Sequence, residues 1–213
     1  MFELQHVAVG YDAQPVLRDV SFTAQDGQIT ALVGTNGCGK TTLLKAIARQ
    51  LPLQQGQILL QGRSIQSFDR KEFARAAAFM PQVRNIPEIT VRGLVSHGRF
   101  PYLGLSRQMT TKDRTAVEKA MQATGVARWA DRDLRELSGG ERQRVYLAMA
   151  LAQGGDTILL DEPTSNLDSL NEAVILKSLH QASDDKTVVL ISHRASTMKI
   201  ADDVYNVECG RMS

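Results

Sequence analysis

The chain has 213 residues, 43% of them hydrophobic and 23% charged, which is enough for one hydrophobic core with a small appended lobe. Its 25 Lys and Arg residues nearly balance its 23 Asp and Glu residues, and a formal net charge of +2 lacks the basic excess of proteins that bind nucleic acid. No stretch approaches the roughly 18 apolar residues of a membrane-spanning helix, and residues 1–6 lack the basic and apolar regions of a secretory signal.

Short apolar segments alternate with helical patterns along the chain. Residues 2–4 and 17–23 alternate between apolar and polar side chains, which predicts an antiparallel β region near the N-terminus. The runs 29–33, 158–160 and 188–191 lack polar alternation and are rich in Leu and β-branched residues. Such runs are typical of strands buried on both faces of a parallel sheet.

Helical periodicity marks two further stretches. Apolar or small residues recur at i, i+3, i+4 and i+7 from residue 117 to 124 and again from 145 to 152. Residues 85–135 carry such helical patterns and no buried-strand run. We therefore predict a single α/β domain with a mixed, mostly parallel sheet, in which residues 1–84 and 136–213 form the core and residues 85–135 an inserted α-helical lobe.

A glycine-rich motif follows the first buried run. It fits the phosphate-loop pattern G-x-x-x-x-G-K-[ST] at every fixed position, and its residues are Gly34, Thr35, Asn36, Gly37, Cys38, Gly39, Lys40 and Thr41. A strand candidate precedes it and a helix candidate opening at Thr42 follows it, which is the context that this motif requires. The motif predicts a P-loop core that binds a nucleoside triphosphate.

The residue types of the loop suit this chemistry. Glycines allow a concave backbone whose amides converge on an anion, and the following helix points its positive end at the same place. Lys40 supplies a full charge to the β- and γ-phosphates, and the hydroxyl of Thr41 can ligate Mg²⁺. Cys38 is interpreted as a small residue tolerated in the loop.

Two adjacent carboxylates end a second buried run. Asp161 and Glu162 follow the apolar residues 158–160, and ligands bind beyond the carboxyl ends of strands in open α/β sheets. Asp161 is therefore a candidate for holding Mg²⁺, and Glu162 could polarise the water that attacks the γ-phosphate. Kinases, GTPases, helicases and many ATPases share these two motifs.

Residues 137–143 read L-S-G-G-E-R-Q and resemble the signature of the ATP-binding cassette (ABC) family. Further matches fall in the order of that family across nearly the whole chain. An aromatic residue, a glutamine after an apolar run, a D-loop and a histidine are similar to its other motifs, and these residues are Tyr11, Gln82, Ser165, Asn166, Leu167, Asp168 and His193.

The resemblance implies a role for each of these residues. Tyr11 would stack on adenine, Gln82 would contact Mg²⁺ and water, and His193 would contact the γ-phosphate. Each ATP would lie between two subunits arranged head to tail. The set contributed by the opposite subunit comprises Ser138, Gly139, Gly140, Glu141 and Gln143.

The same resemblance implies the partners. They are a second cassette subunit, identical or different, membrane-embedded permease subunits and a substrate-binding protein that acts with the permease. The chain would lie on the cytoplasmic face of the cell membrane. No nucleic-acid partner is expected, because the net charge is close to zero. Segments 97–102 and 111–125 are similar to importers of iron-siderophores, haem and cobalamin, whereas residues 194–202 look more like export-type cassettes. A soluble ABC ATPase acting on ribosomes or DNA, and a phosphoryl-transfer kinase, are the alternative classes.

Overall fold

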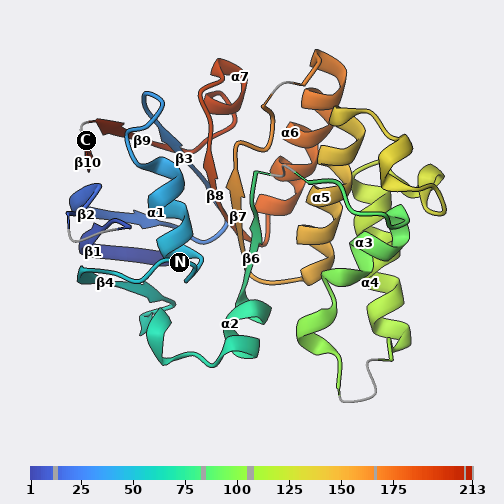
Figure 1. The fold of residues 1–213 in the computed structure, drawn as a ribbon, viewed down its shortest axis with the longest axis horizontal. Helices are drawn as coiled ribbons and strands as arrows, with labels where there is room; N and C mark the ends of the chain where they lie inside the picture. Colours follow the sequence, from blue (N-terminus) through green and yellow to red (C-terminus); the bar gives the residue numbers. More distant parts are fainter. Residues whose placement is uncertain (12–13, 83–84, 105–107, 166, 209, 213) are drawn as a thin grey trace.

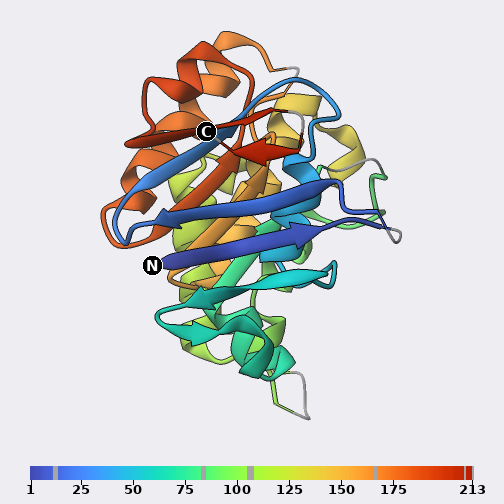
Figure 2. The same cartoon turned by 90° about the vertical axis from the view of Figure 1, so that its left-hand side faces the viewer.

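The computed structural model describes residues 1–11, 14–82, 85–104, 108–165, 167–208 and 210–212. Two sheets and the helices around them make up the fold (Figure 1). An antiparallel four-stranded sheet has the order β2-β1-β4-β5, and its strands are β1 (Phe2–Val9), β2 (Leu17–Ala24), β4 (Gln55–Leu60) and β5 (Arg63–Ser64). Figure 2 shows β1, β2 and β4 side by side in front of the second sheet. The antiparallel β region predicted near the N-terminus is confirmed, with longer strands than the alternation indicated.

The second sheet has six strands in the order β10-β9-β3-β8-β7-β6. Its strands are β3 (Ile29–Val33), β6 (Ala77–Met80), β7 (Thr157–Asp161), β8 (Thr187–Ile191), β9 (Asp203–Glu208) and β10 (Arg211–Met212). All neighbouring pairs are parallel except β9 with β10. The three predicted buried runs are therefore β3, β7 and β8, at the centre of a mostly parallel sheet.

Helices cover both faces of this sheet. They are α1 (Lys40–Ile47), α2 (Arg70–Ala76), α3 (Val91–His97), α4 (Thr111–Ala123), α5 (Gly139–Gln153), α6 (Ser169–Ser183) and α7 (Ala195–Met198). Short 3-10 turns occupy Ile65–Ser67, Phe100–Tyr102, Ala127–Trp129 and Leu134–Glu136. No helix in the described ranges is both long and apolar enough to cross a bilayer.

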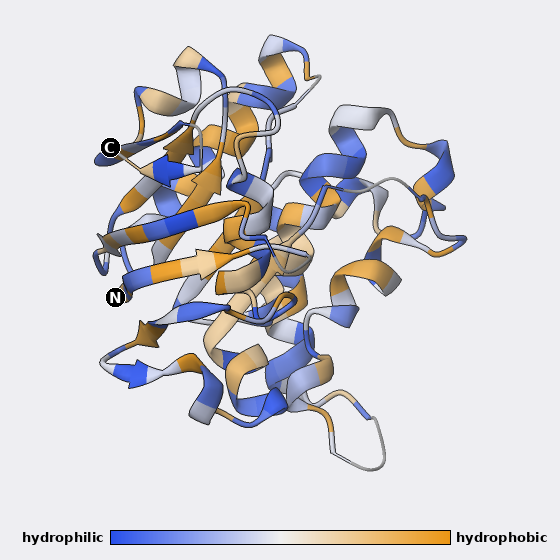
Figure 3. Cartoon of the chain, turned by 60° about the vertical axis from the view of Figure 1, so that its left-hand side comes forward, coloured by the Kyte–Doolittle hydropathy of each residue, from blue (hydrophilic) through white to orange (hydrophobic). Residues whose placement is uncertain are grey.

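Strand periodicity divides the interior into two hydrophobic clusters. Successive side chains of a strand point to opposite faces, so Leu159 packs with α1 while its neighbours Ile158 and Leu160 pack with α3, α4, α5 and α6. Helix α1 and helix α5 therefore lie on opposite faces of the sheet (Figure 1). Figure 3 shows that the strands between them are coloured mostly hydrophobic.

The described residues of segment 85–135 form helices and 3-10 turns, with one isolated bridge between Thr90 and Asp133. Its helices α3 and α4 share the hydrophobic cluster of α5 and the sheet. The boundaries of a separate helical lobe at residues 85 and 135 therefore stay a prediction. Two element ends differ from expectation: α1 begins at Lys40 rather than Thr42, and α4 ends at Ala123 with Thr124 as its C-cap.

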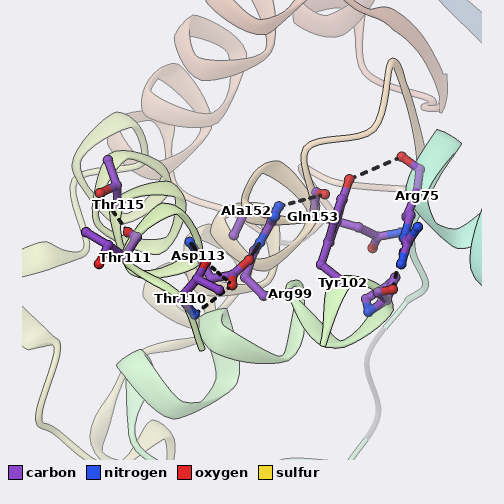
Figure 4. A network of polar contacts seen from close by, with 10 residues as sticks. Arg75, Arg99, Tyr102, Thr110, Thr111, Asp113, Thr115, Ala152 and Gln153 are labelled. Carbon is purple, nitrogen blue, oxygen red and sulfur yellow. Dashed lines mark hydrogen bonds and ion pairs between the residues drawn. The ribbon is translucent and has the colours of Figure 1, made fainter. Parts of the chain in front are cut away.

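A buried arginine connects the helical segment to the end of α5 (Figure 4). Nε of Arg99 lies 2.9 Å from Oδ1 of Asp113 at the start of α4, and the two side chains are only 11% and 6% exposed. Nη1 of the same guanidinium donates to the carbonyls of Ala152 (2.9 Å) and Gln153 (3.1 Å) at the C-terminus of α5. A cation at this helix terminus is favourable because the last carbonyls of a helix have no partners within it.

Candidate functional site

The phosphate loop connects β3 to α1 and depends on glycine at two close approaches. Gly34 has a φ of 142°, and a Cβ there would lie 2.2 Å from the carbonyl oxygen of Val207. Gly39 has a φ of 108°, and a Cβ would lie 2.8 Å from Cγ of Leu17. Glycine is therefore needed at both positions, and it allows the positive φ angles by which the chain passes from β3 into α1, whose first amides have no acceptor within the helix.

Lys40 lies inside this loop and is only 6% exposed. Its Nζ donates to the carbonyls of Gly34 and Thr35, both at 2.8 Å, and lies 3.6 Å from Sγ of Cys38. The ammonium group is therefore already held at the centre of the loop, where it can neutralise phosphate oxygens. A cavity of about 160 Å³ adjoins it and is lined by Asn36, Gly37, Gly39, Lys40, Thr41, Thr42 and Glu162.

Two of the three predicted metal ligands, Thr41 and Asp161, meet beside the loop. Oγ1 of Thr41 donates to Oδ1 of Asp161 across 3.1 Å, and Asp161 is 4% exposed. Burial raises the pKa of Asp161, although the hydrogen bond from Thr41 opposes that rise. One hydroxyl and one carboxylate beside a phosphate cradle fit Mg²⁺, which takes most of its ligands from phosphate and water. Within the described ranges, no cluster of three or more His, Cys, Asp or Glu side chains offers a metal site made by protein alone.

Glu162 and His193 face each other across neighbouring strand ends. Oε1 of Glu162 lies 3.4 Å from Nδ1 of His193, and the His193 side chain is 56% exposed. Glu162 adopts a φ of 50°, a left-handed conformation that non-glycine residues adopt at some cost and that often marks functional sites. Strand β7 pairs with β8 up to Asp161 and Ile191, which brings the two following loops side by side. A carboxylate in this position can accept a proton from water in the adjacent cavity.

Two predicted residues, Gln82 and Tyr11, do not line this cavity. Gln82 is exposed two residues beyond β6, and the parallel pairing of β6 with β7 brings it to the same edge of the sheet as Glu162. Tyr11 follows β1, is 59% exposed and accepts a hydrogen bond from Nζ of Lys45 in α1 at 3.2 Å. The apolar run before Gln82 is the edge strand β6, which was not among the predicted strands.

The signature segment begins α5 on the other face of the sheet from α1. Ser138 caps this helix: its Oγ accepts from the backbone amide of Glu141, whose carboxylate accepts from the amide of Ser138. The hydrogen bond from the Ser138 amide lowers the pKa of the Glu141 carboxyl group. The predicted opposite-subunit set does not line the cavity at the phosphate loop of the same chain, and this set is Ser138, Gly139, Gly140, Glu141 and Gln143.

The predicted D-loop follows Glu162. The amide of Ser165 donates to the carbonyl of Glu162 at 3.2 Å, and Asp168 caps α6 by accepting from the amide of Asn171 at 2.9 Å. The carbonyl of Leu167 accepts from Nη2 of Arg194 at 3.1 Å. Asn166 lies outside the described residues. Arg194 was not among the predicted site residues, and its only sequence signal was that residues 194–202 look more like export-type cassettes.

A lysine buried in a glycine loop, with a hydroxyl paired to a carboxylate at the end of a central strand, is the arrangement of nucleotide hydrolases of the P-loop class. A family comparison narrows this class: the chain belongs to the ABC transporter family, whose model matches residues 17–165. It is accordingly an ATP-binding, ATP-hydrolysing subunit of a transporter.

Two relatives and one solved structure illustrate this membership. The chain is 42% identical over 190 residues to the "Probable siderophore transport system ATP-binding protein YusV" of Bacillus subtilis (strain 168), covering 88% of this chain and 69% of the relative. It is 38% identical over 210 residues to the petrobactin import ATP-binding protein FpuD of Bacillus anthracis, covering 97% and 77%. A dimeric bacterial ABC transporter cassette superposes with a TM-score of 0.87 at 25% identity, covering 100% of this chain and 97% of that one.

Proposed function

We propose that two copies of this cassette, or one copy and a related cassette, bind two ATP molecules head to tail and drive a permease that imports an iron-siderophore type of cargo. The observation that carries the two-subunit arrangement is that α1 and α5 lie on opposite faces of the sheet. The phosphate loop, which leads into α1, and the signature segment, which begins α5, therefore belong to helices on opposite faces of the sheet in one chain. A second subunit would bring its α5 terminus, a natural anion-binding end, to the first subunit's loop.

Each site residue then has a chemical task. Lys40 and the loop amides bind the β- and γ-phosphates, Tyr11 stacks on adenine, and Thr41, Asp161 and Gln82 hold Mg²⁺. When bound, Mg²⁺ neutralises charge on the phosphates. Glu162 accepts a proton as the water oxygen attacks the γ-phosphorus, while the bond to the bridging oxygen of ADP breaks and the electron pair leaves with ADP. His193 contacts the γ-phosphate.

The opposite subunit completes the site. Its Ser138, Gly139 and Gly140 would donate to the γ-phosphate. Glu141 would cap the helix, and Gln143 would lie beside the phosphate donors. The segment 165–168 would lie at the interface. Loss of the γ-phosphate removes the contacts that hold the subunits together, which makes closure a switch that the permease can sense. The chain would lie on the cytoplasmic face of the membrane through the permease, and a substrate-binding protein would deliver the cargo.

Import is favoured over export by the relatives at 38% and 42% identity, whose names describe siderophore or petrobactin transport systems. The test is affinity purification of the chain from detergent-solubilised membranes, combined with uptake of a labelled ferric siderophore by vesicles. We expect permease subunits to co-purify and uptake to require ATP. A matched preparation carrying Glu162→Gln should bind the same permease without uptake. Co-purification of ribosomes in place of permease, or cargo movement out of the cell, would contradict the proposal.

A further inference from the structure

An arginine directly after His193 connects the loops that follow β7 and β8. The guanidinium of Arg194 forms an ion pair with Glu172 in the first turn of α6, and the two side chains are only 24% and 13% exposed. Its Nη2 also donates to the carbonyl of Leu167 at 3.1 Å. One side chain thus contacts both the D-loop backbone and the helix that the D-loop precedes.

Three further hydrogen bonds support this connection. Oγ of Ser196 donates to the same Glu172 carboxylate, and the amide of Arg194 donates to Oγ of Ser192 at 3.1 Å. The hydroxyls of Thr164 and Thr197 lie 3.3 Å apart in the interior. We call the side chains of Arg194, Ser196 and Glu172 with the Leu167 carbonyl the Arg194 cluster.

The Arg194 cluster lies beyond the last paired residues of β7 and β8. The pairing of β7 with β8 ends at Asp161 and Ile191, one residue before Glu162 and two before His193. The His193 side chain is largely exposed, so packing against neighbours contributes little to its position. Because one peptide bond joins His193 to Arg194, the cluster fixes the backbone from which the imidazole projects toward Glu162.

We infer that Arg194 is a positioning residue for ATP hydrolysis: it holds His193 opposite Glu162 and fixes the backbone of the D-loop at Leu167. This inference rests on the roles proposed above for Glu162 and His193. The planar guanidinium suits the task because its fork can satisfy a carboxylate and a carbonyl together, whereas a lysine ammonium acts as a single point charge.

The test is steady-state ATP hydrolysis by Arg194→Ala, Arg194→Lys and Glu172→Gln variants. We expect Arg194→Ala to lower kcat roughly ten- to hundredfold, because small displacements of reacting groups have effects of that size. The KM for ATP should stay within about twofold, since the cluster does not contact the phosphate loop. Arg194→Lys should fall between the wild type and Arg194→Ala, because it keeps the charge partner of Glu172 but not the fork. Glu172→Gln keeps the size of the side chain and removes the charge that pairs with Arg194. It tests the same ion pair if Arg194→Ala does not fold.

Two controls separate positioning from general stability. Arg63→Ala removes another Arg–Glu ion pair, with Nη1 2.5 Å from Oε1 of Glu72 on α2, and should leave kcat unchanged. In a His193→Ala background, single-turnover hydrolysis should be insensitive to Arg194→Ala, because the imidazole that Arg194 positions is already absent. An unchanged kcat in Arg194→Ala, or an equal loss in both backgrounds, would overturn the inference. Normal turnover by Glu162→Gln alone would instead contradict the proposed catalytic roles.

Discussion

The hydroxyl of Thr41 donates to the carboxylate of Asp161 across 3.1 Å, which joins the first turn of α1 to the end of β7. Strands β3 and β7 are not neighbours, because β8 lies between them in the sheet. The contact therefore spans the carboxyl end of β8. It brings together two oxygen groups that are far apart in the sequence. Magnesium binding depends on this pair in the proposed function.

Asp161→Asn tests that dependence. The amide keeps the size of the side chain and an oxygen that can accept from Thr41, but it removes the negative charge that attracts a divalent cation. We expect hydrolysis to need a higher Mg²⁺ concentration and to fall roughly a hundredfold at millimolar Mg²⁺, as after loss of other strong electrostatic stabilisers. Hydrolysis rates across a Mg²⁺ titration measure this, and an unchanged titration curve would remove Asp161 from the metal site.

The same substitution has an opposite effect on stability. Because burial raises the pKa of Asp161 above its ordinary value of 3.8, the folded protein binds the proton more tightly than the unfolded chain. The stability of the wild type should therefore fall as pH rises from about 3.8 through the raised pKa. Asp161→Asn lacks this loss. Urea unfolding at several pH values, with EDTA and without nucleotide, measures the free energy of unfolding of both proteins. The value for Asp161→Asn should rise relative to that of the wild type as pH increases through this range. A difference that does not change with pH would argue against the raised pKa.

Lys40→Ala should weaken ATP binding. Hydrogen bonds to charged groups contribute about 1.5–3 kcal/mol, so the dissociation constant should rise roughly ten- to hundredfold. Titration calorimetry on the nucleotide-free protein gives this value directly. Lys71→Ala, which removes an exposed lysine on α2, is the matched control and should bind ATP normally. Equal affinities for the two variants would refute the assignment of the phosphate loop.

Glu162→Gln should accumulate as an ATP-bound dimer. Without the general base, hydrolysis should slow about 10²–10⁴-fold, so the closed state persists. Size-exclusion chromatography with MgATP measures the dimer. A Cβ at Gly139 meets open space, so Gly139→Asp should fold normally and yet oppose a phosphate from the other subunit by charge. In the Glu162→Gln background, Gly139→Asp should abolish the dimer while Gly139→Ala keeps it. A dimer that tolerates Gly139→Asp would contradict the two-subunit site.

Arg99→Ala should destabilise the fold. The pair of Arg99 with Asp113 is buried, and removing one partner of such a pair costs about 3 kcal/mol or more (Figure 4). Arg135→Ala is the comparison, because its ion pair with Asp133 is more exposed and should contribute less than about 1 kcal/mol. Urea denaturation of both variants measures the two free energies of unfolding. Equal losses would indicate that burial of the pair does not matter.

Local features were predictable from the sequence. The phosphate loop, the acidic end of β7 and the signature segment are short and contiguous, so their residue types identify them without knowledge of the rest of the chain. The three central strands were also predictable, because burial on both faces leaves a continuous apolar run. Strand β6 was not, since its apolar run is rich in alanine and lacks the β-branched residues that mark the central strands.

Contacts between distant segments needed the tertiary structure. No spacing rule relates Thr41 to Asp161, Glu162 to His193 or Glu172 to Arg194, because these pairs meet only when parallel strands align their carboxyl ends. The same alignment puts α1 and α5 on opposite faces, since alternate side chains of each strand point to opposite sides. Residue identity thus specifies which chemistry the chain carries, and strand pairing decides which residues perform it together.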